Sequence, residues 1–155
     1  MKTIKFHFYE GKSLVSRLIK WRTYSIYSHV SIQIDNEIIE SWVGGGQSGV
    51  VISTDPLTYH KKGTNITTIE IEMKNWKPWL VFLKSQIGKK YDYKAILNFV
   101  KNKTKQNPNR WFCSELANTF FEFELKNYKN NRLVSPQSFY DTIKTYSLLQ
   151  KHKEV

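Results

Sequence analysis

The stretch SHVSIQIDNEIIESW, Ser28–Trp42, has the pattern of two short strands joined by a tight turn. Apolar and polar residues alternate from position 30 to position 34, which is the period of a strand with one buried face. The dipeptide Asp35-Asn36 is typical of a hairpin turn, and a second strand is expected to begin near Ile38. The stretch therefore predicts an antiparallel hairpin.

Further strands are expected on both sides of this hairpin. The segment TIKFHFY at 3–9 alternates in the same way, and TTIEIEM at 67–73 gives another strand. The glycine-rich VGGGQSGVV at 43–51 leads into a short strand. It lacks the strand-to-helix context and the lysine of a phosphate-binding loop, so it does not indicate a nucleotide site.

Helical spacing dominates the second half of the chain and one early segment. Ser13 is placed to cap a short helix in which Leu14, Leu18 and Trp21 fall on one side. The other expected helices cover residues 79–99 with a break at 87–92, the segment that begins at Cys113, and a closing segment with Ser135 as N-cap and Pro136 at the first helical position.

A run of strands followed mainly by helices is the α+β class. The chain has 155 residues, 40% of them hydrophobic and 15% aromatic, which suits one globular domain with a proper core. We expect a single domain over 1–150, with a frayed tail at 151–155. No apolar stretch has the length of a signal peptide or a membrane span, so we expect a soluble cytoplasmic protein.

The formal net charge is +11, which is high for this size. Such a charge can attract nucleic acid, an anionic membrane surface or another anionic polymer, but it fits a lysine-rich solvated surface equally well. No nucleic-acid recognition motif appears in the sequence. The densest basic stretch contains eight cations: Lys84, Lys89, Lys90, Lys94, Lys101, Lys103, Lys105 and Arg110.

Cys113, in RWFCSELANTFFEF at 110–123, is the one cysteine of the chain and cannot form an internal disulfide. A reducing compartment, or a fold indifferent to redox state, follows from this. The cysteine lies in the first turn of its expected helix, where free N–H groups favour a thiolate. Lone cysteines are more often buried and inert, so a nearby base is needed before catalysis is inferred.

Four histidines are candidates for that base. His7 alternates with apolar strand residues and is expected to face solvent, His60 lies in a loop, and His152 lies in the tail. His29 stands at the start of an apolar strand, a rigid place for an imidazole. Glu40 on the paired strand is the carboxylate expected to reach it and to orient it. A structural histidine and an exposed strand carboxylate remain the alternatives.

The segments YSHVSIQI, IIESW, GVV, IGKKYDY and WFCSELAN follow one another in an order that resembles the circularly permuted NlpC-type papain-like cysteine proteins. YiiX-like bacterial proteins, poxvirus proteins and lecithin–retinol acyltransferase relatives belong to this group. The resemblance covers about residues 13–140. It implies a papain-like domain in which an antiparallel sheet packs against the nucleophile helix and further helices.

By this resemblance Cys113 is the nucleophile, His29 the base and Glu40 the orienting residue. Tyr91 matches a family tyrosine near the site, and SPQSFY at 135–140 matches a closing structural element. The predicted substrate contacts are Tyr91 and the two residues before the base, Tyr27 and Ser28.

The resemblance implies a cysteine-dependent hydrolase or acyltransferase that acts on an amide or ester bond, with no metal and no cofactor. The substrate is a peptidoglycan peptide or a lipid-like molecule, and Trp21, Tyr24 and Tyr27 are expected to line an apolar cleft in the second case. A phage- or virus-encoded protein that reaches the cell wall is compatible with the missing export signal. The alternative is a non-catalytic module that binds a polyanion, either nucleic acid or an anionic membrane surface.

Overall fold

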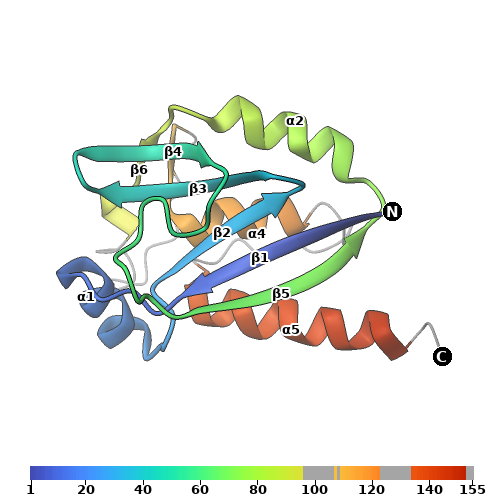
Figure 1. Ribbon diagram of the computed structural model, residues 1–155, viewed down its shortest axis with the longest axis horizontal. Coiled ribbons are helices and arrows are strands. Elements are labelled where there is room, and N and C mark those ends of the chain that lie inside the picture. Colours follow the sequence, from blue (N-terminus) through green and yellow to red (C-terminus); the bar gives the residue numbers. More distant parts are fainter. Residues whose placement is uncertain (96–106, 108, 123–133, 153–155) are drawn as a thin grey trace.

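The structure is a computed structural model that describes residues 1–95, 107, 109–122 and 134–152. Its centre is an antiparallel sheet of five strands in the order β4-β3-β2-β1-β5 (Figure 1). Every neighbouring pair in this sheet is antiparallel. The strands are β1 (Lys2–Tyr9), β2 (His29–Ile34), β3 (Glu37–Gly44), β4 (Gln47–Ser53) and β5 (Ile66–Met73).

The hairpin predicted from the sequence is present as β2 and β3. Ile32 pairs with Ile39 and Ile34 pairs with Glu37, so the turn between the strands contains two residues. Asp35, the first of them, has a φ of 55°, a left-handed conformation that short polar side chains tolerate in such turns. This register determines which side chains of the two strands share a face.

Four helices and a small parallel pair of strands complete the described part of the chain. Helix α4 lies against β2 and β3, and α5 runs along β5, on the side of the sheet shown behind and below it in Figure 1. The helices are α1 (Leu14–Thr23), α2 (Trp76–Gln86), α4 (Cys113–Glu122) and α5 (Pro136–His152), and the parallel pair is β6 (Lys90–Tyr91) with β7 (Arg110–Trp111).

The main core lies between the sheet and the helices α4 and α5. Phe6 and Phe8, on alternate positions of β1, are fully buried and contact Phe139 of α5 through ring centroids 5.3 and 5.9 Å apart. Phe120 of α4 closes the same cluster against Phe6. The α+β class with an antiparallel sheet is therefore confirmed. The closing helix continues through His152, two residues further than the expected boundary at 150.

The other face of the sheet is covered at His7, although the side chains of Lys5 and Glu70 on the same face reach solvent, and this corrects the expectation for His7. Its side chain is buried because both ring nitrogens meet partners on the neighbouring strands: Nδ1 contacts Thr68 Oγ1 at 2.8 Å, and Nε2 contacts Gln33 Oε1 at 2.7 Å. Strand alternation gave the correct face, but the sequence did not show that this face was covered. None of the described helices is long and apolar enough to span a membrane.

Candidate active site

The hairpin brings together the two residues that the sequence analysis paired. Nε2 of His29 lies 2.5 Å from Oε2 of Glu40, and both side chains are almost inaccessible to solvent, at 8% and 1%. His29 is the first residue of β2, and Glu40 follows the turn on β3. The two-residue turn sets the register that places both on the same face of the sheet. Their predicted contact is confirmed.

Cys113 begins helix α4, as expected, and is buried. Phe112 acts as the N-cap: its carbonyl accepts the N–H of Leu116 at 3.0 Å, and its own N–H donates to the carboxylate of Glu115 at 3.2 Å. This is one half of a capping box, and it leaves the N–H groups of the first helical residues free to face a negative charge. The Ser41 hydroxyl donates to the Trp111 carbonyl at 2.6 Å, which ties the chain before the cysteine to β3.

His29 lies between Cys113 and Glu40. Burial alone lowers the pKa of His29, but the electrostatic effect of Cys113, a hydrogen bond to Cys113 and the bond to Glu40 outweigh it and raise the pKa to about 10. Because Nε2 is bonded to Glu40, Nδ1 is the ring nitrogen left for the sulfur. The arrangement is therefore an imidazolium that interacts with Cys113 on one side and is hydrogen-bonded to the Glu40 carboxylate.

Glu40 remains charged although it is buried. Burial raises the pKa of its carboxyl, but the hydrogen bonds and charges of His29 and His60 lower it to about 2. Both histidines contact the same oxygen, Oε2, while Oε1 is buried without a hydrogen-bond partner. The carboxylate thus depends on its two histidine partners for stabilisation.

His60, a candidate that the sequence places in a loop and does not connect to Glu40, also belongs to the site. Its Nε2 lies 3.2 Å from Oε2 of Glu40, and its ring stacks on Tyr9 with centroids 3.8 Å apart and planes 6° apart. The Tyr9 hydroxyl is held in turn by Ser31 at 2.8 Å. Burial lowers the pKa of His60 more than Glu40 raises it, so its ring is neutral and donates Nε2–H to the carboxylate.

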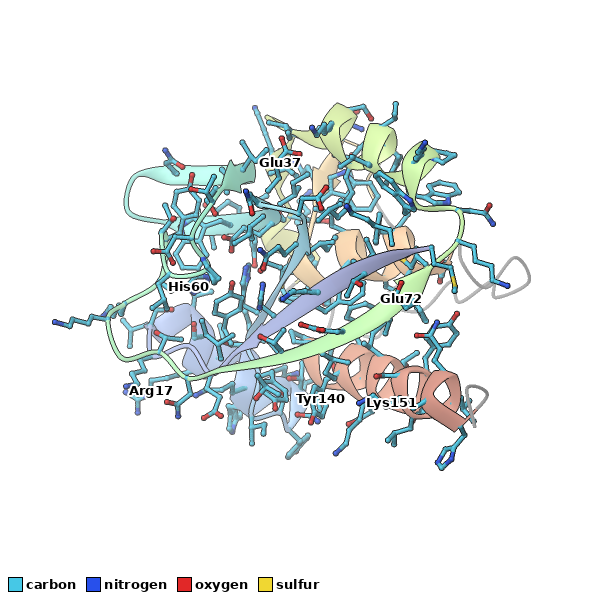
Figure 2. All side chains as sticks on the ribbon, turned by 45° about the vertical axis from the view of Figure 1, so that its right-hand side comes forward. Arg17, Glu37, His60, Glu72, Tyr140 and Lys151 are labelled. Carbon is cyan, nitrogen blue, oxygen red and sulfur yellow. The ribbon has the colours of Figure 1, made fainter. Side chains whose placement is uncertain are left out.

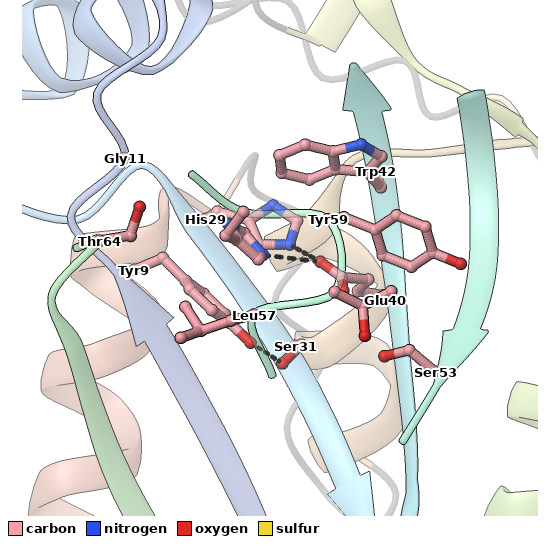
Figure 3. A network of polar contacts seen from close by, with 12 residues as sticks. Tyr9, Gly11, His29, Ser31, Glu40, Trp42, Ser53, Leu57, Tyr59 and Thr64 are labelled. Carbon is pink, nitrogen blue, oxygen red and sulfur yellow. Dashed lines mark hydrogen bonds and ion pairs between the residues drawn. The ribbon is translucent and has the colours of Figure 1, made fainter. Parts of the chain in front are cut away.

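The sequence carried only the residue type of His60 as a signal. It lies in the loop between β4 and β5, twenty residues after Glu40. No strand period or cap connects a loop residue to a particular carboxylate, because the contact depends on how the loop folds back over the sheet. Figure 3 shows this loop, with Leu57 and Tyr59, crossing the face that carries His29 and Glu40.

Within the described part of the chain, His29, Glu40 and His60 also form a group that could hold a metal ion, with ligand atoms within 4.8 Å of one another. The 2.5 Å separation of His29 and Glu40 is that of a hydrogen bond. Two ligands of one tetrahedral zinc ion lie about 3.3 Å apart, given zinc–nitrogen bonds of about 2.0 Å. In this arrangement both histidines are therefore hydrogen-bonded to Glu40, and a metal ion would have to separate His29 from Glu40.

Tyr91 lies next to the cysteine, whereas the other two predicted substrate contacts do not face the site. Burial and the electrostatic effect of Cys113 raise the pKa of Tyr91, and its ring packs against Phe112. Tyr27 is a core residue whose hydroxyl donates to Thr67. The Ser28 hydroxyl is buried and accepts the N–H of Gly11. These two side chains therefore contact β5 and the chain after β1, which the sequence pattern did not reveal.

A cavity of about 370 Å³ adjoins the site on the side of His60. Aromatic side chains form one part of its lining, and Lys12 and Lys61 are its charged residues. His60 lines this cavity and also contacts Glu40, so it lies between the two. Trp42 lines the cavity as well, and its ring meets the ring of His29 edge-on, with the two centroids 5.5 Å apart. Neither His29 nor Cys113 lines this cavity, so it borders the site through His60 and Trp42.

The predicted basic stretch is only partly described. Lys84 is paired with Glu37 at 2.7 Å, whereas Lys101, Lys103 and Lys105 lie outside the described residues. A comparison with family models and with curated proteins finds no match to this chain.

Proposed function

We propose that the protein is a cysteine-dependent hydrolase or acyltransferase that acts on an amide or ester bond, with a permuted NlpC-type papain-like domain. The observation that carries this proposal is the position of His29 between Cys113 and Glu40. A cysteine at a helix start, a base in contact with it and a carboxylate behind the base are the three parts of a thiol nucleophile system. The order of the motifs along the chain supports the same family.

In the proposed reaction the Cys113 thiolate attacks the carbonyl carbon and forms a carbon–sulfur bond. The developing oxyanion accepts a hydrogen bond from the Cys113 N–H at the start of α4. As the tetrahedral intermediate collapses, the bond to the leaving nitrogen or oxygen breaks, and His29 gives that atom its Nδ1 proton. A thioester remains. The neutral imidazole then takes a proton from water or from an acceptor alcohol or amine, which attacks the thioester and releases the thiol as thiolate.

Glu40 and His60 support the base without touching the substrate. The carboxylate of Glu40 fixes the ring of His29 and stabilises its charged form, as the raised pKa of His29 indicates. His60 donates to the same oxygen and so limits the rotation of Glu40. We therefore propose His29 as the catalytic base and Glu40 and His60 as positioning residues.

The test uses the absence of any second cysteine. Iodoacetamide labelling followed by mass spectrometry measures the alkylation of Cys113 alone, because the chain has one cysteine. The proposal requires that Cys113 is alkylated in the native protein near pH 6. His29→Ala is expected to move the labelling profile toward alkaline pH, because the imidazolium that stabilises the thiolate is removed. His7→Gln is the matched control, since it changes another buried histidine of the same sheet, whose ring nitrogens bond Thr68 and Gln33 instead of Glu40 or Cys113.

Turnover is measured with p-nitrophenyl acetate, for which Cys113→Ala provides the baseline. A burst of p-nitrophenol equal to the protein concentration indicates the thioester intermediate. A native cysteine that does not react, or a labelling profile that His29→Ala leaves unchanged, would refute the proposal.

A further inference from the structure

The outward side of helix α1 is apolar, contrary to the usual arrangement of a helix on a globular domain. Leu14 is 82% exposed and Trp21 is 71% exposed, and Leu18 between them is also exposed. Ile19 is the one fully buried side chain of this helix. The spacing of Leu14, Leu18 and Trp21 predicts that they share one side of the helix, and in the structure this side faces solvent instead of the core.

The apolar surface continues beyond the end of the helix. Tyr24 ends α1 in a left-handed conformation, with φ 49°, and its side chain is 92% exposed. Ile26 follows and is also exposed. The expected cleft lined by Trp21, Tyr24 and Tyr27 is therefore absent, because the first two side chains point outward and Tyr27 is buried. We call the five exposed residues Leu14, Leu18, Trp21, Tyr24 and Ile26 the α1 patch.

Cations flank the α1 patch. At 100° per residue, Leu14, Leu18 and Trp21 fall within about 60° of arc, with Arg17 and Arg22 on opposite borders. Lys12 and Lys20 add two further cations, and no acidic residue occurs between Gly11 and Ile34. Arg17 extends away from the body of the protein in Figure 2.

We propose that the α1 patch docks on an anionic membrane surface. The helix would lie in the plane of the interface with Leu14, Leu18 and Trp21 among the acyl chains and its cations at the lipid phosphates. With ten residues, α1 is about 15 Å long, half the thickness of the hydrocarbon layer, so it cannot span it. Trp21 and Tyr24 are of the residue types that prefer the boundary between headgroups and acyl chains.

Charge decides between a membrane and a second copy of the chain. If two α1 patches packed face to face, the cations on their borders would be brought together in an apolar contact, and their repulsion would oppose the dimer. An anionic membrane buries the apolar residues among its acyl chains and pairs the cations with its lipid phosphates.

Docking through α1 would also place the cavity near the lipid. Ser13 and Ser16, from the first turns of α1, line the cavity that His60 borders. If the proposed catalytic function is correct, this arrangement favours a substrate that carries an acyl chain or is held at a membrane surface. Membrane docking itself does not depend on that function.

The experiment measures co-sedimentation of the full chain with vesicles of phosphatidylcholine alone and with vesicles that also contain phosphatidylglycerol. We expect binding to the anionic vesicles that weakens as salt is added, because counterions screen the lipid charge. Trp21→Glu is expected to reduce this binding by about tenfold or more, since it removes an inserted ring and adds a negative charge. Val81→Glu on α2 is the matched control, with a side chain 70% exposed outside the patch, and it is expected to bind as the unmodified protein does.

Circular dichroism melts of both variants check that the fold is kept, which is expected because both side chains are exposed. The double variant Arg17→Gln with Lys20→Gln removes two cations and keeps the apolar side chains, so it measures how much charge contributes to vesicle binding. It is expected to reduce the preference for anionic vesicles. Equal binding to neutral and anionic vesicles would overturn the proposal, as would equal losses for Trp21→Glu and Val81→Glu. The proposal would also be overturned if the protein bound no vesicles and self-associated in gel filtration, with the self-association abolished by Trp21→Glu. Labelling of Cys113 tests the catalytic proposal separately, so either proposal can fail alone.

Discussion

Replacing Glu40 with glutamine tests the charged centre of the site with almost no change in shape. The variant keeps a carbonyl oxygen that can accept a hydrogen bond from one histidine, but it loses the negative charge that His29 and His60 share. If the carboxylate is stabilised in the folded protein as the structure indicates, Glu40→Gln will destabilise the fold at neutral pH. This loss of folding free energy will be largest near neutral pH and will decrease as the pH falls.

The magnitude follows from the pKa of Glu40, which the fold lowers from 4.5 to about 2. Each pKa unit corresponds to about 1.4 kcal/mol, so the shift gives about 3 kcal/mol of stability. Because the folded pKa is the lower one, this stabilisation is fully present above pH 4.5 and is lost as the pH falls toward 2. Removing one partner of a buried ion pair generally costs about 3–5 kcal/mol of stability. Because the glutamine can still accept one hydrogen bond from a histidine, the cost for Glu40→Gln is expected at the lower end of this range.

The assay is urea unfolding of Glu40→Gln and the unmodified protein at pH 7, at pH 3.5 and near pH 2. The difference in free energy of unfolding is expected to be about 3 kcal/mol at pH 7 and to shrink steadily in acid. Other carboxyl groups titrate equally in both proteins and cancel in the difference. Glu37→Gln, on the same strand, is the control: its pair with Lys84 is exposed to solvent, and its loss should cost less than about 1 kcal/mol. A Glu40→Gln variant as stable as the unmodified protein, or a difference that does not decrease in acid, would refute the reasoning.

Further predictions concern the neighbours of the site. His60→Phe keeps a ring to stack on Tyr9 but loses the bond to the carboxylate, so thermal unfolding should show a loss of about 2 kcal/mol, and ester turnover should fall while iodoacetamide labelling persists. Gly49→Ala should lower the melting temperature markedly, because its Cβ would lie 2.3 Å from the backbone oxygen of Lys89 at a φ of 131°; Gly45→Ala, which has open space, should lower it less. Heparin should bind at low salt and dissociate as salt rises if the basic stretch from Lys84 is functional; no binding at low salt would contradict that function.

The sequence determined the parts of this protein that depend on local period and turn chemistry. Alternation in β2 and the Asp35 turn were enough to predict the hairpin and the contact of His29 with Glu40, whereas the exact register came from the structure. The N-cap at Ser13 was also predictable, and its side chain accepts the N–H of Ser16 in the structure. In each case the residues that interact are close in the chain, so their geometry follows from backbone preferences alone.

Contacts between distant segments were decided only by the tertiary structure. His60 reaches Glu40 because the loop after β4 folds over the sheet. His7 is buried, and its ring is bonded to Thr68 and Gln33 of the two neighbouring strands. The residue pattern of α1 showed an apolar side but could not show whether that side met the core or solvent, and the structure turns Trp21 outward. Cys113 and His29 are 84 positions apart, and they meet because α4 packs on β2 and β3. A sequence period specifies which residues share a face, whereas what covers that face depends on the packing of the whole chain.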